Sequence, residues 1–214
     1  MGIRVISTII AAAESYDLTT LENVKSELNI TDDASDAVLE RYIAGASASI
    51  AQFCGRRFQV ETVKDEFWPD REFYAYQVQG AIPSLQLSRW PAVTVSTVTE
   101  NDIALDDGSD FSVDKDNGLL LRLDGLKYPT VWGAWPISVT YDGGFEPIPP
   151  DVEDAAIRMV KARFLAKGRD PNLKQENIVG VREVSYWIAT GSDAGNMTPD
   201  IEDILDNYRP KVLV

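Results

Sequence analysis

The chain contains no histidine and only one cysteine, and these absences exclude whole classes of chemistry. Without histidine there is no Ser-His-Asp or Cys-His triad, and the side chain that most often moves protons near neutral pH is missing. A zinc site built from His and Cys ligands is excluded for the same reason. The single cysteine, Cys54, cannot form a disulfide within the chain, so no disulfide framework marks a secreted scaffold.

Long apolar runs and basic residues are also scarce. No apolar run reaches about 18 residues, so the sequence predicts no membrane-spanning helix. The first 13 residues hold a short apolar run interrupted by Ser7 and Thr8, which favours an extended arm or a first strand over a signal peptide. The 34 acidic residues outnumber the 20 basic ones and give a net charge of −14. This balance argues against a chain whose whole surface binds nucleic acid, while leaving a local basic patch open.

Three stretches of the sequence have the periodicity of amphipathic helices. Thr19-Thr-Leu-Glu22 predicts a helix that has Thr19 as its N-cap and ends near Asn29. A second, longer helix is predicted over residues 35–54, where the following Gly55 favours a stop. A third helix, led by Pro150, is predicted over residues 150–167.

Between the second and third helices, the composition is that of a β-rich module. Val, Thr and aromatic residues alternate there with Pro and Gly, as is typical of short strands. Asn117-Gly118, between two apolar runs, is the strongest hairpin signal. The predicted strands cover residues 59–68, 72–79, 85–87, 94–100, 111–114, 119–123 and 137–141.

The C-terminal part is predicted to carry one strand, a linker and a short helix that begins at Thr198-Pro199. The apolar side chains of this helix either fold back onto the chain's own core or enter a groove of a neighbour, and the sequence leaves both open. In the second case, removing residues 196–214 would leave the rest of the chain folded. The contact residues would then be Ile201, Ile204, Leu205, Tyr208 and Leu213.

These elements predict an α+β fold in one domain: a small helical bundle with a β-rich insertion and a C-terminal helical arm. The bundle consists of two N-terminal helices and the Pro-led third helix. The predicted parts are an N-terminal extended arm (1–17), the helical core (18–55 and 149–168), the β-rich insertion (56–146), a strand (178–190) and the linker with the arm (191–214).

Charge is segregated along the chain. Basic residues gather on the third helix and the loop after it, and acidic residues gather near the C-terminus. Such segregation suits complementary surfaces between copies of the chain or between the chain and a partner, and solvated helix faces are the simpler alternative. The candidate residues for contact between subunits are Arg158, Lys161, Arg163, Lys167 and Arg169.

No motif assigns a catalytic, metal-binding or cofactor-binding residue. Asp106, Asp107 and Asp110 crowd together, and paired carboxylates can act as acid and base, but the turn-like sequence favours a solvated loop. Asp114-Lys-Asp-Asn-Gly118 does not have the Gly and Glu positions of a calcium-binding loop. The five Trp residues can form a binding platform, although packing is their more frequent use.

The order of these segments resembles the head–tail connector (adaptor, or head-completion) proteins of tailed bacteriophages. The similarity spans about residues 18–167 and is weakest over 179–214. Four stretches carry it: residues 18–30, residues 32–56 with their Phe53-Cys-Gly-Arg56 ending, residues 110–120, and residues 139–157 with their Pro-led helix.

The resemblance implies a structural role, not an enzymatic one, and no cofactor. Such proteins form a ring, commonly of about twelve subunits, beneath the portal of a filled capsid. The ring extends the DNA channel without reading its sequence and docks a tail or stopper protein. Similar proteins occur in gene-transfer particles. The resemblance therefore implies a place in the virion neck after synthesis in the bacterial cytoplasm, and a portal contact for the C-terminal arm.

Two other functions remain as alternatives. One is a phage-associated glycan hydrolase that uses Asp106, Asp107 or Asp110. The other is a β module that binds carbohydrate or peptide through its Trp residues.

Overall fold

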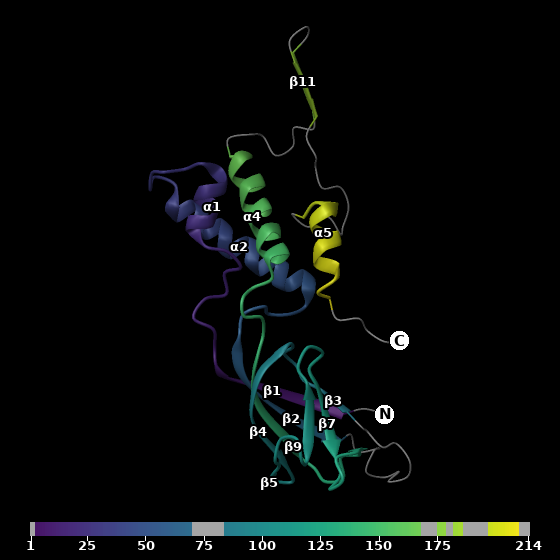
Figure 1. Cartoon of the computed structure of the whole chain (residues 1–214). Coiled ribbons are helices and arrows are strands. Elements are labelled where there is room, and N and C mark those ends of the chain that lie inside the picture. Colours follow the sequence, from purple (N-terminus) through teal and green to yellow (C-terminus); the bar gives the residue numbers. More distant parts are fainter. Residues whose placement is uncertain (1–2, 70–83, 168–174, 179–181, 186–196, 210–214) are drawn as a thin grey trace. The chain divides into compact units, whose positions relative to one another are not determined.

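The computed structural model describes residues 3–69, 84–167, 175–178, 182–185 and 197–209. The chain divides into two compact units. The β unit comprises Met1–Ser15 and Arg57–Pro147, and the helical unit comprises Tyr16–Arg56 and Ile148–Val214. Each unit is described by itself below (Figure 1).

The helical unit confirms the helices that the sequence predicts. Their bounds are α1, Leu21–Leu28; α2, Asp36–Cys54; α4, Pro150–Leu165; and α5, Pro199–Asp206. Gly55 ends α2 in the left-handed conformation at φ 62°, and Pro150 begins α4. Apolar faces of the four helices meet in one core, which contains Val24, Leu39, Ile43, Ile50, Val152, Ala155, Val160, Ile201 and Leu205.

The predicted cap of α1 is wrong by one residue. Thr20 is the N-cap, and its side chain accepts a hydrogen bond from the Asn23 N–H at 3.2 Å. Thr19 is buried, and its hydroxyl donates to Glu153 of α4 at 3.1 Å. A tertiary partner therefore decides which of the two adjacent threonines caps the helix.

The strand predicted over residues 178–190 is also corrected. The structure has two short antiparallel strands there, β10 (Gln175–Ile178) and β11 (Arg182–Ser185), which pair with each other. Strand β10 lies before the predicted strand except for Ile178, and its residues 175–177 are all polar. Because they show no apolar alternation, the hairpin was missed. Residues 179–181 and 186–190 of the predicted strand lie outside the described residues.

The β unit contains a five-stranded antiparallel sheet in the order β1-β2-β9-β4-β5. A second antiparallel sheet has the order β3-β7-β6, with β8 paired to β7. The bounds are β1, Ile3–Ala11; β2, Glu61–Pro69; β3, Ser84–Gln86; β4, Ala92–Glu100; β5, Ile103–Ala104; β6, Phe111–Asp114; β7, Leu119–Leu123; β8, Pro129–Thr130; and β9, Ile137–Gly143.

Alternate residues along each strand point to opposite faces of the first sheet, and one of these faces is buried. In β2, residues 61, 63, 65 and 67 are buried while the residues between them are half-buried. The apolar residues of both sheets form one core, which contains Val63, Phe67, Leu85, Leu87, Val98, Phe111, Leu120, Trp132, Ile137, Val139 and Tyr141. The α+β class is thus confirmed, with the mainly helical and mainly β parts segregated.

Three further predictions from the sequence have different outcomes in the structure. The arm expected over residues 1–17 includes strand β1, which pairs with β2 and belongs to the β unit. The predicted hairpin at Asn117-Gly118 is present between β6 and β7, with Gly118 at φ 63°. A side chain at Gly118 would lie 2.6 Å from Cβ of Trp90, so glycine is required there. The strand expected over residues 72–79 lies outside the described residues.

Candidate functional site

The basic residues of α4 have partners on the other helices of the same unit. Arg158 pairs with Asp154 at 2.7 Å and with Asp200 of α5 at 3.3 Å. Lys161 pairs with Glu27 of α1 at 2.6 Å. These pairs show that the segregated charges join helices within the chain, an arrangement that the sequence alone does not reveal.

The ion pairs shift the titration of their members in the expected directions. The hydrogen bond from Lys161 lowers the pKa of Glu27. The hydrogen bond to Asp154 raises the pKa of Arg158 further above its usual range. Because these groups are exposed, water and salt screen the pairs strongly.

The other basic candidates differ in their surroundings. The guanidinium of Arg163 lies over the ring of Tyr42 on α2, 4.5 Å from the ring centroid. Lys167 is exposed at the end of α4. Arg169 lies outside the described residues. A role of these five candidates in subunit contacts stays a prediction.

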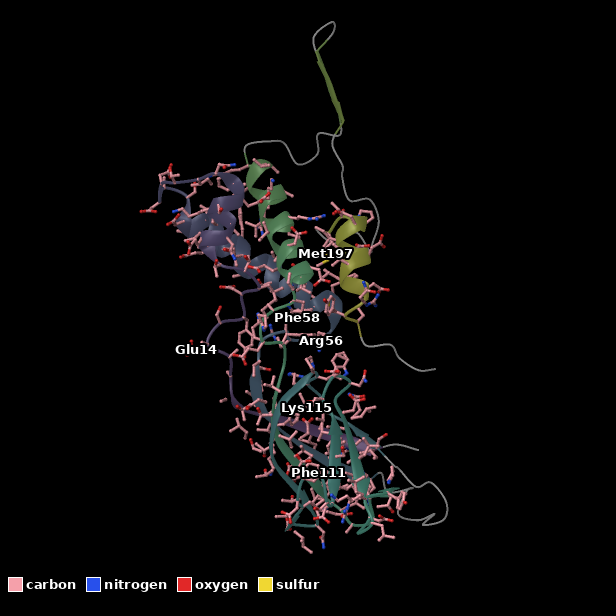
Figure 2. The ribbon with its side chains drawn as sticks, in the orientation of Figure 1. Glu14, Arg56, Phe58, Phe111, Lys115 and Met197 are labelled. Atoms are coloured by element: carbon pink, nitrogen blue, oxygen red, sulfur yellow. The ribbon has the colours of Figure 1, made fainter. Side chains whose placement is uncertain are left out.

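Helix α5 lies against α4 and α2 through its apolar face (Figure 1). Leu205 is 0% exposed and Ile201 is 3% exposed. Met197, just before the helix, is buried as well (Figure 2). The described structure thus has the arm folded back on its own unit, one of the two arrangements that the sequence leaves open.

Polar contacts fix both ends of α5. At its start, Asp200 meets Arg158. After its end, the Tyr208 hydroxyl donates to the Asp151 carboxylate, 2.7 Å from Oδ1 and 2.9 Å from Oδ2. Burial, together with the bond to Asp151, raises the pKa of Tyr208 to about 12.

The portal-contact candidates therefore divide into three groups. Ile201 and Leu205 are core residues in this arrangement and present no surface to a partner. Ile204 and Tyr208 are half-buried and keep part of their surface exposed. Leu213 lies outside the described residues. Portal contact by this segment stays a prediction. Because Ile201 and Leu205 are buried, removing residues 196–214 would expose the core of the helical unit.

The carboxylates of the alternative hydrolase site hold a turn together. Asp110 accepts a hydrogen bond from the Asp106 N–H at 3.0 Å, and its carboxylate lies 3.7 Å from Arg122. Asp106 and Asp107 are exposed. Within the described residues, no three His, Cys, Asp or Glu side chains are grouped so that they could hold a metal ion.

Asp114 likewise stabilises the turn between β6 and β7. Its carboxylate accepts from the Asn117 N–H at 3.2 Å and from the Asn117 amide at 2.8 Å. These hydrogen bonds, the side-chain one first, lower the pKa of Asp114. The hairpin interpretation of this segment agrees with the geometry.

The tryptophans that the structure describes do not form one platform. Trp132 is 4% exposed in the core of the β unit, and Trp135 packs against that core. Trp90 contacts Gly118, and Trp68 of β2 is 42% exposed. Trp187 lies outside the described residues.

A buried polar cluster in the β unit was not predicted from the sequence. Asp65 of β2 is 0% exposed, and its Oδ1 accepts from the Ser7 hydroxyl at 2.6 Å and from the Ser88 hydroxyl at 2.7 Å. Oδ2 accepts from the Ser88 N–H at 2.8 Å and from the Tyr141 hydroxyl at 2.7 Å. Burial raises the pKa of Tyr141 well above its usual range. The available signal was an aspartate at an inward position between Val63 and Phe67.

This cluster holds three parts of the β unit together. Ser7 belongs to β1, Tyr141 belongs to β9, and Ser88 follows β3. Every donor is neutral, so four hydrogen bonds compensate the carboxylate for the loss of water. The arrangement fixes the position of β1 against β2.

Sequence comparison finds one family model that matches part of the chain. Residues 18–83 match the family model described as Phage gp6-like head-tail connector protein. The resemblance to the head–tail connector family is confirmed. The matched residues contain α1, α2 and β2. They also contain the first two of the four stretches that carry the resemblance. No curated protein matches the chain.

Two solved structures share the fold of this chain. One is a chain in the neck of an empty gene transfer agent (GTA) particle computed with C6 symmetry, with a TM-score of 0.56 and 13% identity. The other is a chain in the virion of a native GTA particle, with a TM-score of 0.51 and 12% identity. Each alignment covers 98% of this chain and 97% of the other chain. At these identities the likeness shows the fold.

No helix among the described residues combines the length and apolar character that crossing a membrane requires.

Proposed function

We propose that the chain is a structural head–tail connector in the neck of a tailed phage or gene transfer agent particle. The observation that carries the proposal is the match of residues 18–83 to the connector family. The fold supports it, because a chain of a GTA neck aligns over 98% of this protein. The role is assembly, with no reaction to catalyse and no cofactor to bind.

In this role the chain forms a ring beneath the portal protein, extends the DNA channel and docks a tail or stopper. The similar neck was computed with C6 symmetry, and a ring of twelve subunits also contains a sixfold axis. The net charge of −14 supports a conduit, since an acidic lining repels phosphates and lets DNA pass without binding.

The portal contact would use the part of the C-terminal segment that the fold leaves accessible. Ile204 and Tyr208 are half-buried, so each keeps some surface for a partner while α5 stays folded. Leu213 belongs to the same proposed contact. The charge of Lys167 at the end of α4 is available for a neighbouring subunit.

Electron microscopy of the full-length chain mixed with its portal tests the proposal. We expect rings of the chain on the portal, and Ile204→Ala should weaken the complex by several-fold. Ser109→Ala, an exposed change in the β unit, is the matched control and should leave binding unchanged. Absence of both rings and portal binding would overturn the proposed function.

A further inference from the structure

Among the strands that the structure describes, β1 lies at the edge of its sheet. Within residues 3–69 and 84–147, β2 is the sole strand that pairs with β1. The pairing runs from Ile3 to Ile9 without interruption, and its register shifts only between Ile9 and Ala11. A long, regular edge strand presents a row of backbone N–H and C=O groups to which another strand can add.

The side chains of this strand favour such an addition. Val5 and Ile9 are 40% and 48% exposed on the face that carries the core. Ile6 and Ile10 are 46% and 59% exposed, and Ile6 lies on the opposite face. The strand contains no proline or lysine, the residues that often protect edges, and its one charged residue is Arg4. Exposed apolar side chains therefore lie on both faces of the strand.

At the opposite end of the same sheet, β4 is partly covered. The Ala92 N–H donates to the Lys115 carbonyl at 2.8 Å and the Val93 carbonyl accepts from the Lys115 ammonium at 3.0 Å, whereas no second described strand pairs with residues 94–97. Strand β5 pairs with β4 only at Thr99 and Glu100. Between Ala92 and Thr97, β9 is the sole described strand that pairs with β4. Two register shifts in this stretch indicate bulges, which bend a strand and increase its twist.

Strand direction makes the two edges compatible. Successive strands of the sheet alternate in direction, so β1 runs antiparallel to β4. A neighbouring copy in the same orientation would place its β1 antiparallel to β4, and the alternation would continue across the boundary. Because the two edges differ, the contact is head-to-tail, and such contacts generate rings when the rotation closes.

Charges at the two ends of these edges are complementary. Arg4 lies at the end of the sheet where β4 ends, and the exposed Asp102 follows β4 there. Glu14, just after β1, lies at the end where β4 begins. Lys115 is at that end too, because its ammonium donates to the Val93 carbonyl at 3.0 Å (Figure 2). Antiparallel addition therefore brings Arg4 toward Asp102 and Glu14 toward Lys115.

We infer that β1 of one copy adds to the uncovered part of β4 in the next copy, so that the five-stranded sheets join edge to edge. This inference rests on the proposed function, since it names the contact between subunits of the ring. Antiparallel pairing of two β1 strands would bring Arg4 of each copy toward Glu14 of the other, but such a two-fold contact closes at a dimer and does not generate a ring. The buried Asp65 cluster supports the addition, because it holds β1 rigidly in place through Ser7.

Disulfide trapping in the full-length chain tests the inference. Thr8→Cys and Thr94→Cys place thiols on two exposed positions at the middle of the two edges. Under mild oxidation, the double variant should form a ladder of dimers, trimers and larger species, both in concentrated solution and on the portal. A mixture of the two single variants should stop at dimers. The native chain, whose only cysteine is buried, should remain uncrosslinked.

Charge exchange supplies a second measurement. Arg4→Glu should reduce the crosslinked fraction of the double-cysteine chain several-fold, and adding Asp102→Arg should restore it. Dimers from Thr8→Cys alone would indicate pairing between two β1 strands and would overturn the inference. A double variant without a ladder would overturn it too. Rings on the portal without a ladder would leave the proposed function standing, so the two failures are distinguishable.

Discussion

The two units of the chain use charged residues in opposite ways. In the helical unit, the cations of α4 reach acidic residues on neighbouring helices across exposed surfaces. In the β unit, Asp65 and Glu61 are 0% and 2% exposed and are held by hydrogen bonds inside the structure. Exposed pairs contribute little stability, whereas an interior carboxylate left without its partners is costly. Whether a charged side chain is buried or exposed therefore says more about its structural role than the sign of its charge does.

The largest effect should follow from breaking the interior cluster of the β unit. Asp65→Ala leaves the hydroxyls of Ser7, Ser88 and Tyr141 without their acceptor. We expect the free energy of unfolding to fall by about 3–5 kcal/mol, because four hydrogen bonds are lost, the buried Tyr141 hydroxyl loses this acceptor, and the removed side chain leaves a cavity. Tryptophan fluorescence during urea unfolding measures it, since Trp132 and Trp135 lie in this unit.

Asp65→Asn is the matched control, because it keeps the volume and one acceptor oxygen. It should cost less than the alanine variant. Equal losses for the two variants would contradict the role given to the hydrogen bonds and would point to volume alone.

A smaller loss, of about 3 kcal/mol, should follow from truncating the buried face of α5. Leu205→Ala removes a 0% exposed side chain and leaves a cavity in the helical unit. Circular dichroism at the helical band, followed through urea unfolding, measures the effect. Ile204→Ala, at the half-buried neighbour, should cost clearly less. If the two variants are equally stable, α5 is not packed as described.

The smallest effect should come from the partly exposed clamp between Tyr208 and Asp151. Tyr208→Phe removes a hydrogen bond to a carboxylate, and we expect a loss of about 1 kcal/mol at neutral pH. The folded protein raises the pKa of Tyr208 to about 12, from about 10 in the unfolded chain. The contribution is therefore fully present below about pH 10 and is lost as the pH rises toward 12.

Unfolding of the native chain and of Tyr208→Phe at a series of pH values measures this contribution. The difference between the two proteins isolates Tyr208 from other groups that titrate in the same range. A difference that persists unchanged above pH 12 would contradict the assignment.

Much of the helical unit could be predicted from local signals. The bounds of α2 and α4 follow from apolar periodicity, a C-terminal glycine and a leading proline, which act over a few residues. The cap of α1 could not be predicted, because Thr19 and Thr20 are equally able to cap and only the contact with Glu153 separates them. The hairpin of β10 and β11 was missed because residues 175–177 are polar and show no apolar alternation, so only the pairing with β11 identifies β10 as a strand.

The candidate site shows a similar division. The basic residues of α4 and the acidic residues near the C-terminus were recognisable as segregated charge. The pairing of these charges within the chain could not be recognised from the sequence. Arg158 and Asp200 are 42 residues apart, and they meet only because α5 lies on α4. The burial of Ile201 and Leu205 likewise depends on where the helix lies, and an amphipathic helix shows the same pattern whichever surface covers it.

By itself, the sequence determined the α+β class, most element boundaries and the resemblance to head–tail connectors, because these depend on periodicity, turn residues and the order of short motifs. The tertiary structure alone decided which strands lie at the edges of the sheet, which carboxylates are buried and where α5 is placed. Each of these depends on contacts between residues far apart in the chain. Local sequence sets the conformation of a segment, whereas only the folded whole determines the neighbours that it meets.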